Sequence, residues 1–471
     1  MAVDKGSLAA LVSPEYGLRH NVLGLFDSIA QSISTMAPSA SAAMTIPLVF
    51  GSAGKGTWLA YLLATICTLI VGMCIARFAR DSASPGSLYT YTTTSLPPAL
   101  RSVAAWSLVM AYVGSGASVV GGFVHYANVV LSDFFKTTWP DVFLSVVCVA
   151  LPVWVAYRDV KVSARLMLYI EIGSVTMISA VFAILLWKHG LHVDLSQLTL
   201  RGVNFSGVRL GLILAMFSLV GFESATTLGQ EVRNPLRTIP RAIILSALLS
   251  GAFFMAASYT EVLGFPDSAG TLDQSTAPLS VLATAAGVGF LGSVIDICVM
   301  VTMLACTLAC LTATARVLML MDHNGLAPRV LESVHPRNRT PHMAVLASGV
   351  AMALLSVPFS MARVSGETVY DWMGSLATYG FITVYALVAI ALPFYLKKRH
   401  SLGLGSILLS ALAVGAMGVV LAGTLYPVPD PPLNYLPYLF LGYLVVAAAC
   451  NLWHARRTAP AVVGVAPAGG G

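Results

Sequence analysis

Apolar residues along this chain gather into long runs, and each run is separated from the next by a short polar stretch. A helix that crosses a bilayer needs about 20 predominantly apolar residues, and by that measure the pattern predicts roughly twelve membrane-spanning helices. Their expected limits are Asp27–Phe50, Thr57–Ala79, Val103–Leu131, Val142–Tyr157, Leu166–Trp187, Leu210–Gly229, Ile239–Leu263, Pro278–Met321, Ala344–Ala362, Tyr370–Leu396, Leu404–Leu425 and Tyr435–Trp453. The eighth is too long for one simple span, so we expect its ends to tilt or to leave the bilayer.

Composition agrees with an all-α polytopic membrane protein whose solvent is the lipid bilayer. Of the 471 residues, 57% are hydrophobic and only 10% are charged, and the mean hydropathy is +0.82. A water-soluble domain carries roughly 25% charged residues. There is no basic run with interleaved aromatics, so nucleic acid is not an expected partner. The seven cysteines lie in apolar runs without metal-ligand spacing, which predicts neither a metal site nor a disulfide framework.

The basic residues predict an orientation in the membrane. If the N-terminus lies in the cytoplasm, 20 of the 26 Lys and Arg residues fall on the cytoplasmic side and 6 on the other. Cytoplasmic loops carry such an excess, so we expect a protein of the cell (inner or plasma) membrane with both termini on the cytoplasmic side. We expect residues 1–20 to form a cytoplasmic segment and residues 458–471 to be a disordered tail. The short loops leave no room for a catalytic domain.

Two of the predicted spans contain sequences that disfavour a continuous helix. The first carries Pro38 and Pro47 around a run of Ser and Ala, and the sixth carries Gly221 and Glu223 at mid-depth. Interrupted helices at matching positions of two halves indicate an inverted-repeat transporter and its binding site. Half-helix ends offer N–H groups to a carboxylate and carbonyls to an ammonium, which suits an amino acid. The alternative for either break is an ordinary kink in a membrane helix.

Four ordered stretches resemble the amino acid–polyamine–organocation (APC) superfamily of permeases. They are Pro85-Gly-Ser-Leu-Tyr-Thr-Tyr91; Lys161-Val-Ser-Ala-Arg165; Gly221-Phe-Glu-Ser-Ala225 with Gln230-Glu-Val-Arg-Asn-Pro235 and Thr238-Ile-Pro-Arg241; and Ala315-Arg-Val-Leu-Met-Leu-Met-Asp-His-Asn-Gly-Leu-Ala-Pro328. The resemblance implies a LeuT-like, five-plus-five inverted repeat with broken helices one and six. Residues 21–400 would form this ten-helix transport core, and residues 401–457 two additional transmembrane helices.

The resemblance also implies that substrate binds between the two breaks. The family's Gly-Ser-Gly motif on helix one falls on Ala40, Ser41 and Ala42, which are small but lack glycine's tolerance of positive φ. Pro38 is therefore a second candidate for the unwinding. Phe217 falls where relatives carry an aromatic lid; its alternative is an apolar core residue. The substrate-binding candidates are Ser39, Ala40, Ser41, Ala42, Phe217, Ser218, Gly221 and Phe222.

Ion coupling is expected near the fifth span. Many relatives carry a coupling lysine there, and Ser174 stands at the matching position in this chain. Glu171 lies one helical turn away on the same face. A carboxylate inside a bilayer is a functional candidate by default, so the coupling candidates are Glu171, Ser174 and Glu223. Their alternative is a structural hydrogen bond to a neighbouring helix.

Together these features predict a secondary active transporter for amino acids that works by alternating access, in proton- or Na⁺-coupled or exchange mode. The alternative substrate is a polyamine or another organic amine. A membrane-embedded enzyme would need nucleophiles, His residues or metal ligands clustered at one depth, which the chain does not show. A pore would need polar stripes along several helices. No cofactor is expected, and the absence of a nucleotide motif argues against an ATP-driven pump.

Overall fold

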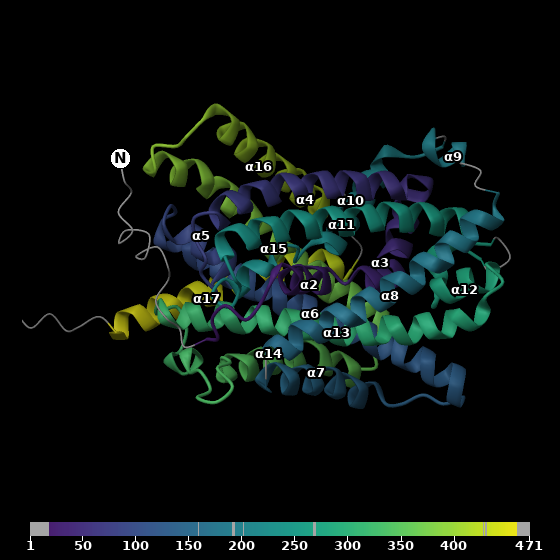
Figure 1. The fold of residues 1–471 in the computed structure, drawn as a ribbon, viewed down its shortest axis with the longest axis horizontal. Coiled ribbons are helices and arrows are strands. Elements are labelled where there is room, and N and C mark those ends of the chain that lie inside the picture. The colour runs from purple at the N-terminus through teal and green to yellow at the C-terminus, as the bar shows by residue number, and fades with distance from the viewer. Residues whose placement is uncertain are drawn as a thin grey trace, which may run out of the picture.

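The computed structural model describes residues 18–158, 160–190, 194–200, 202–266, 270–426, 428 and 431–458. Most of the expected N-terminal segment and nearly all of the expected tail lie outside these residues. The described chain is helical and contains no strand, apart from one isolated bridge between Leu23 and Val232. Most long helices run side by side along the long axis of the molecule, with α5 towards one end and α9 and α12 towards the other (Figure 1).

Each long apolar run forms a helix, because lipid offers no partners to backbone N–H and C=O groups. The long elements are α2 (Leu25–Met36), α3 (Pro38–Ala53), α4 (Thr57–Ala79), α6 (Pro98–Phe135), α7 (Asp141–Arg158), α8 (Val160–Lys188), α10 (Phe205–Leu219), α11 (Pro235–Gly264), α13 (Gly289–His323), α14 (His342–Met361), α15 (Gly366–Lys398), α16 (Leu404–Leu425) and α17 (Leu436–Thr458). The short elements are η1 (Gly54–Gly56), α5 (Ser87–Thr93), α9 (Leu195–Leu198), η2 (Ser224–Leu228), η4 (Leu272–Gln274), α12 (Pro278–Ala285), η5 (Arg329–Glu332) and η6 (Leu433–Tyr435).

Eleven helical stretches of the described chain are long and apolar enough to cross a membrane. The first, Leu25–Ala79, has 55 residues. That length exceeds two passages of about 20 residues, so this stretch is long enough to hold both of the first two expected spans; the exact number of spans stays a prediction. The expected eighth span, Pro278–Met321, is wrong at its start. The helix that begins at Pro278, α12, ends at Ala285. Three residues follow, and α13 begins at Gly289 as a separate helix.

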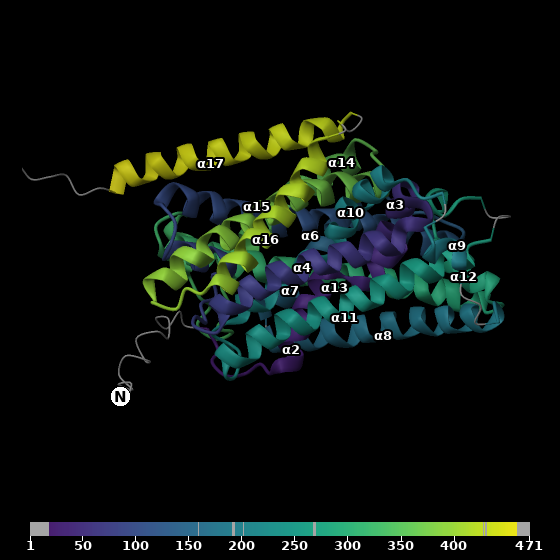
Figure 2. The same ribbon diagram turned by 90° about the horizontal axis from the view of Figure 1, so that it is seen from above.

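The helices divide into a buried centre and a periphery. In the apolar windows of α6 and α15, 83% and 78% of the residues are buried, against 22% and 17% in those of the last two spans. α17 runs along one edge of the molecule (Figure 2). The peripheral position of α16 and α17 suits helices added to a core. The repeat symmetry and the domain limits stay predictions.

Candidate functional site

The first break lies between α2 and α3, at a single residue. Ala37 adopts the left-handed conformation, with φ 45° and ψ 66°. Pro38 explains this, because proline lacks an N–H and disfavours the α conformation of the residue before it. Ala40–Ala42 lie within α3, so the expectation that they unwind is wrong. Pro38, the second candidate, stands at the break itself.

The second break separates α10 from η2. The backbone is extended at Val220 and takes φ +88° at Gly221, before the 3-10 turn begins at Ser224. A Cβ atom on Gly221 would lie 2.4 Å from Cγ2 of Thr35 in α2. The two breaks are therefore in direct contact, and a glycine is needed where they meet.

Glu223 fixes the second break to the two most buried helices. The Tyr112 hydroxyl of α6 donates to Oε1 at 2.7 Å, and the Tyr385 hydroxyl of α15 donates to Oε2 at 2.6 Å. The Gly221 N–H donates to the same Tyr385 oxygen at 3.2 Å. Glu223 is fully buried, and both carboxylate oxygens are engaged. This arrangement makes Glu223 a clamp on the break; its role as a proton carrier stays a prediction.

Glu171 of α8 binds the start of α3. Its Oε1 accepts hydrogen bonds from the Ser39 N–H at 3.2 Å and from the Ser39 hydroxyl at 3.1 Å. Thr302 of α13 continues this network, because its hydroxyl lies 3.0 Å from that of Ser39 and 2.9 Å from that of Ser174. The carboxylate thus sits where the helix N-terminus favours negative charge.

The second oxygen of Glu171 is in a different situation. Oε2 is buried and has no hydrogen-bond partner among the described residues. Glu171 also lines a cavity of about 270 Å³ between α2, α8 and α11. A buried carboxylate oxygen without a partner is costly, so this group is suited to binding a proton or a cation. In the described chain, no group of three or more His, Cys, Asp or Glu residues could hold a metal ion.

The aromatic candidate Phe217 lines a second cavity, of about 330 Å³, between α3, α10, α15 and α16; we call it the Phe217 cavity. The Phe217 ring packs edge-on against Tyr370, with centroids 5.7 Å apart. The Tyr370 hydroxyl lies 2.9 Å from that of Thr45. Thr45, Phe217 and Tyr370 therefore join α3, α10 and α15 at this cavity.

The other predicted residues near the breaks face neighbouring helices. The Ser218 hydroxyl lies 3.0 Å from the Tyr61 hydroxyl of α4. The Phe222 ring packs against Tyr385 at 5.5 Å. The Ser41 hydroxyl donates to the Met36 carbonyl at 3.3 Å, across the first break. Neither Ser218 nor Phe222 lines the Phe217 cavity, so as substrate ligands they stay predictions.

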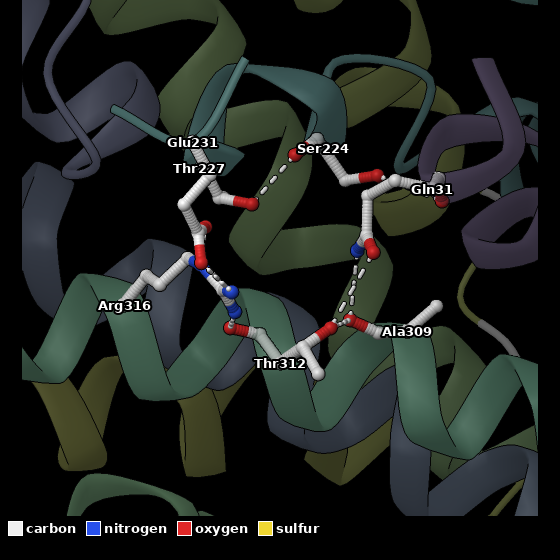
Figure 3. Close-up of polar contacts among 7 residues, drawn as sticks. All are labelled: Gln31, Ser224, Thr227, Glu231, Ala309, Thr312 and Arg316. Atoms are coloured by element: carbon white, nitrogen blue, oxygen red, sulfur yellow. Dashed lines mark hydrogen bonds and ion pairs between the residues drawn. The ribbon is translucent and has the colours of Figure 1, made fainter. Parts of the chain in front are cut away.

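A buried polar network joins α2, α13 and the segment Ser224–Glu231 that contains η2 (Figure 3). It lies on the α5 side of the breaks, because Ser87 of α5 is hydrogen-bonded to Thr226 of η2. The Gln31 amide donates to the Ala309 carbonyl at 3.0 Å, and the Gln31 backbone carbonyl accepts from the Ser224 hydroxyl at 3.2 Å. Arg316 binds Glu231 through two hydrogen bonds of 2.8 and 2.9 Å. We call the whole set the Arg316 network; it comprises Gln31, Ser224, Thr227, Glu231, Ala309, Thr312 and Arg316.

Backbone hydrogen bonds reinforce the contacts of the Arg316 network. The N–H groups of Val22 and Leu23 donate to the Glu231 carbonyl at 2.9 and 3.0 Å, and the Arg233 N–H donates to the Leu23 carbonyl at 2.8 Å. These bonds form the Leu23–Val232 bridge, which ties the segment before α2 to the segment after η2.

Sequence reasoning missed several of these residues. Tyr112 and Tyr385 have apolar neighbours on both sides, and that isolation is the signal that could have identified them. Gln31 lies in a stretch rich in Ser, and nothing in that stretch distinguishes it. Arg316 is one of the 20 basic residues that the expected orientation places on the cytoplasmic side; the structure places it within α13, where it is 2% exposed. Glu231 and Arg316 both belong to motifs that carry the family resemblance, but spacing alone does not show that they pair.

Comparison with known proteins covers nearly the whole described chain. Residues 23–449 match the family described as "Amino acid permease". The branched-chain amino acid permease BcaP of Bacillus subtilis is 25% identical over 373 residues, 74% of this chain and 76% of that protein. The low-affinity putrescine importer PlaP of Escherichia coli K12 is 26% identical over 356 residues, 73% of this chain and 74% of that protein.

Two further proteins extend this comparison. Mouse cationic amino acid transporter 4 is 25% identical over 395 residues, 80% of this chain and 60% of that protein. Among solved structures, a mutant of the Eremococcus coleocola manganese transporter superposes with a TM-score of 0.56, at 13% identity, over 92% of this chain and 94% of that one. That likeness concerns the fold alone.

Proposed function

The chain belongs to the amino acid permease family, and from this premise we propose that it moves an amino acid or a closely related amine across the cell membrane by alternating access. It is a multi-pass membrane transporter, and its relatives are named for branched-chain amino acids, putrescine and cationic amino acids. The contact between the two breaks, at Thr35 and Gly221, is the observation that carries the proposal. Broken helices that meet at mid-depth are how such transporters build a substrate site.

In this proposal, α2 and η2 are the moving cytoplasmic halves of the broken helices. The Arg316 network and the Leu23–Val232 bridge keep the path on the α5 side closed. On the other side, the Phe217 cavity extends inwards as far as Phe217 and Tyr370. The substrate would bind between these two layers and would leave when the cytoplasmic halves swing away from α13.

The α5 side would face the cytoplasm, as the basic residues predict. A Ser333→Cys variant in a background without native cysteines should react with a membrane-impermeant thiol reagent only when the reagent is inside sealed vesicles. Thr137→Cys, at the opposite end, should react only from outside. Both positions are exposed. Labelling of Ser333→Cys from outside would contradict this orientation.

Glu171 would couple transport to a proton. Its carboxylate holds the start of α3 through Ser39 and borders the cavity beside α2. When α2 moves, this cavity opens and water reaches the carboxylate, which would release a proton to the cytoplasm. When α2 returns, the site is dry again, and protonation avoids burying an uncompensated charge. The proton and the movement of α2 would thus be linked.

Replacing Glu171 by Gln should abolish concentrative uptake driven by a pH gradient, while exchange of labelled for unlabelled substrate continues. Gln keeps an oxygen that can accept the Ser39 hydrogen bonds, so folding should be retained. Uptake and exchange would be measured in proteoliposomes with and without Na⁺.

The matched control is Ser174→Ala, which removes a hydroxyl from the same network but leaves the carboxylate in place. This variant should keep pH-driven uptake. If Glu171→Gln still accumulates substrate with an unchanged pH profile, Glu171 has a structural role. If wild-type uptake requires Na⁺ and ignores the pH gradient, the coupling ion is not the proton.

A further inference from the structure

The lining of the Phe217 cavity combines aromatic rings, hydroxyl groups and one acid. Among the described residues that line it, Asp371 is the one charged side chain. The hydroxyl-bearing residues are Thr45, Ser52, Ser375, Thr378, Thr424, Tyr370 and Tyr379. Its volume of about 330 Å³ lies within the usual range for small-molecule sites, about 300–1,000 Å³. The cavity is therefore large enough for a small organic solute and carries a negative charge.

Asp371 differs from the buried carboxylates that have partners. Glu223 is held by two tyrosines and Glu231 by Arg316. Asp371 lies in the second turn of α15, is half-buried and borders the cavity. No described side chain forms a hydrogen bond or an ion pair with its carboxylate. A carboxylate within a membrane helix usually has a partner, and here the remaining space beside it is the cavity.

Lipid is a poor occupant for this space. Acyl chains offer no donor to Asp371, and leaving the carboxylate against them would cost several kcal/mol. An ammonium group offers three donors and a full positive charge. The faces of Phe217 and Tyr379, at the same cavity, can add a cation–π attraction. The lining therefore matches a cation better than an apolar chain.

We propose that the Phe217 cavity is an outer binding position for a solute with net positive charge, a diamine or a cationic amino acid, whose ammonium group pairs with Asp371. This inference rests on the proposed transport function and gives it a substrate class. A neutral zwitterion would bring its own carboxylate into a cavity whose described lining has no Lys, Arg or His to receive it. Such a solute would gain less from Asp371, because the two carboxylates repel each other.

The position of the cavity also gives Asp371 a place in the transport sequence. Thr45, Phe217 and Tyr370 belong to its lining and contact one another, and Phe217 lies in the last turn of α10, just before the second break. A solute held by Asp371 therefore contacts the residues that must part before it can reach Gly221. Selection for charge would take place here, ahead of the site where the broken helices enclose the substrate.

The test compares Asp371→Asn with Glu367→Gln. Both remove one negative charge from the start of α15, but Glu367 does not line the cavity and instead faces His125 at 3.3 Å. Uptake of lysine, putrescine and leucine would be measured in proteoliposomes, and binding of each by its effect on thermal unfolding. Asp371→Asn should raise the KM for lysine or putrescine about tenfold, which corresponds to about 1.4 kcal/mol of binding, and leave that for leucine nearly unchanged.

Glu367→Gln should leave the uptake and binding of all three substrates as in the wild type, and Asp371→Glu should retain cation uptake. An effect confined to putrescine would identify a diamine site, and an effect on lysine a cationic amino acid site. The proposal is overturned if Asp371→Asn handles cations normally, if it loses leucine uptake equally, or if the wild type binds neither cation. Leucine uptake by the wild type in that last case would leave the proposed transport function intact.

Discussion

Replacing Arg316 by Met should lower the thermal stability of the purified protein more than any single change at a surface ion pair. The side chains of Arg316 and Glu231 are 3% and 1% exposed, and they share two hydrogen bonds. The variant leaves the Glu231 charge buried without its partner, which costs about 3–5 kcal/mol. Unfolding in detergent, followed by intrinsic fluorescence, measures the effect.

The pair formed by Arg399 and Asp81 provides the control. Arg399 Nη1 lies 3.0 Å from Asp81 Oδ2, and the two side chains are 36% and 34% exposed. Arg399→Met should therefore lower the free energy of unfolding by at most about 1 kcal/mol. Adding Glu231→Met to Arg316→Met should restore much of the lost stability, because no buried charge is then left alone. If Arg316→Met unfolds at the same temperature as Arg399→Met, the Arg316 network does not hold α13 to the moving halves.

Replacing Gly221 by Ala should reduce transport by at least about tenfold while leaving the protein in the membrane. An L-residue at φ +88° is strained by roughly 1–2 kcal/mol, and the added Cβ would lie 2.4 Å from Thr35 Cγ2. Thr35 cannot turn away easily, because its hydroxyl is bonded to the Gln31 carbonyl at 2.8 Å and to Ser224 at 2.9 Å. The two breaks must therefore separate, which distorts the proposed site.

Gly173→Ala is the matched control for this change. Gly173 also lies in a membrane helix, but a Cβ there would meet nothing within 4 Å. That variant should transport at wild-type rates. Initial uptake rates, normalised to protein recovered in the membrane, would compare the two. A Gly221→Ala variant that transports normally would show that the contact between the breaks is not needed for function.

The sequence predicts the spans and the presence of two breaks well, because lipid leaves an apolar run little choice but a helix. The sequence also places Glu171 and Ser174 on one face of a helix, one turn apart. In the structure both belong to the network around Ser39 and Thr302. The position of the first break follows from local chemistry: Pro38 forces Ala37 out of the helix, and the small residues after it stay helical.

What the sequence does not predict depends on contacts between distant parts of the chain. Nothing local indicates that Tyr112 and Tyr385, which belong to different spans, both reach Glu223. The same holds for Gln31 and Ala309, and for Glu231 and Arg316. In the sequence, Asp371 is one acid among several near span ends. It becomes a candidate binding residue only in the structure, where α3, α10 and α16 enclose the cavity beside it.

The Leu23–Val232 bridge has a consequence for the states that the proposed transport cycle can populate. Its three backbone hydrogen bonds are worth about 1 kcal/mol each, so a state in which α2 has swung out without η2 lies about 3 kcal/mol above one in which both have moved. Such a half-open species would make up less than about 1% of the open molecules. In the proposed cycle, the path on the α5 side should therefore open cooperatively, without a populated intermediate that leaks substrate or protons.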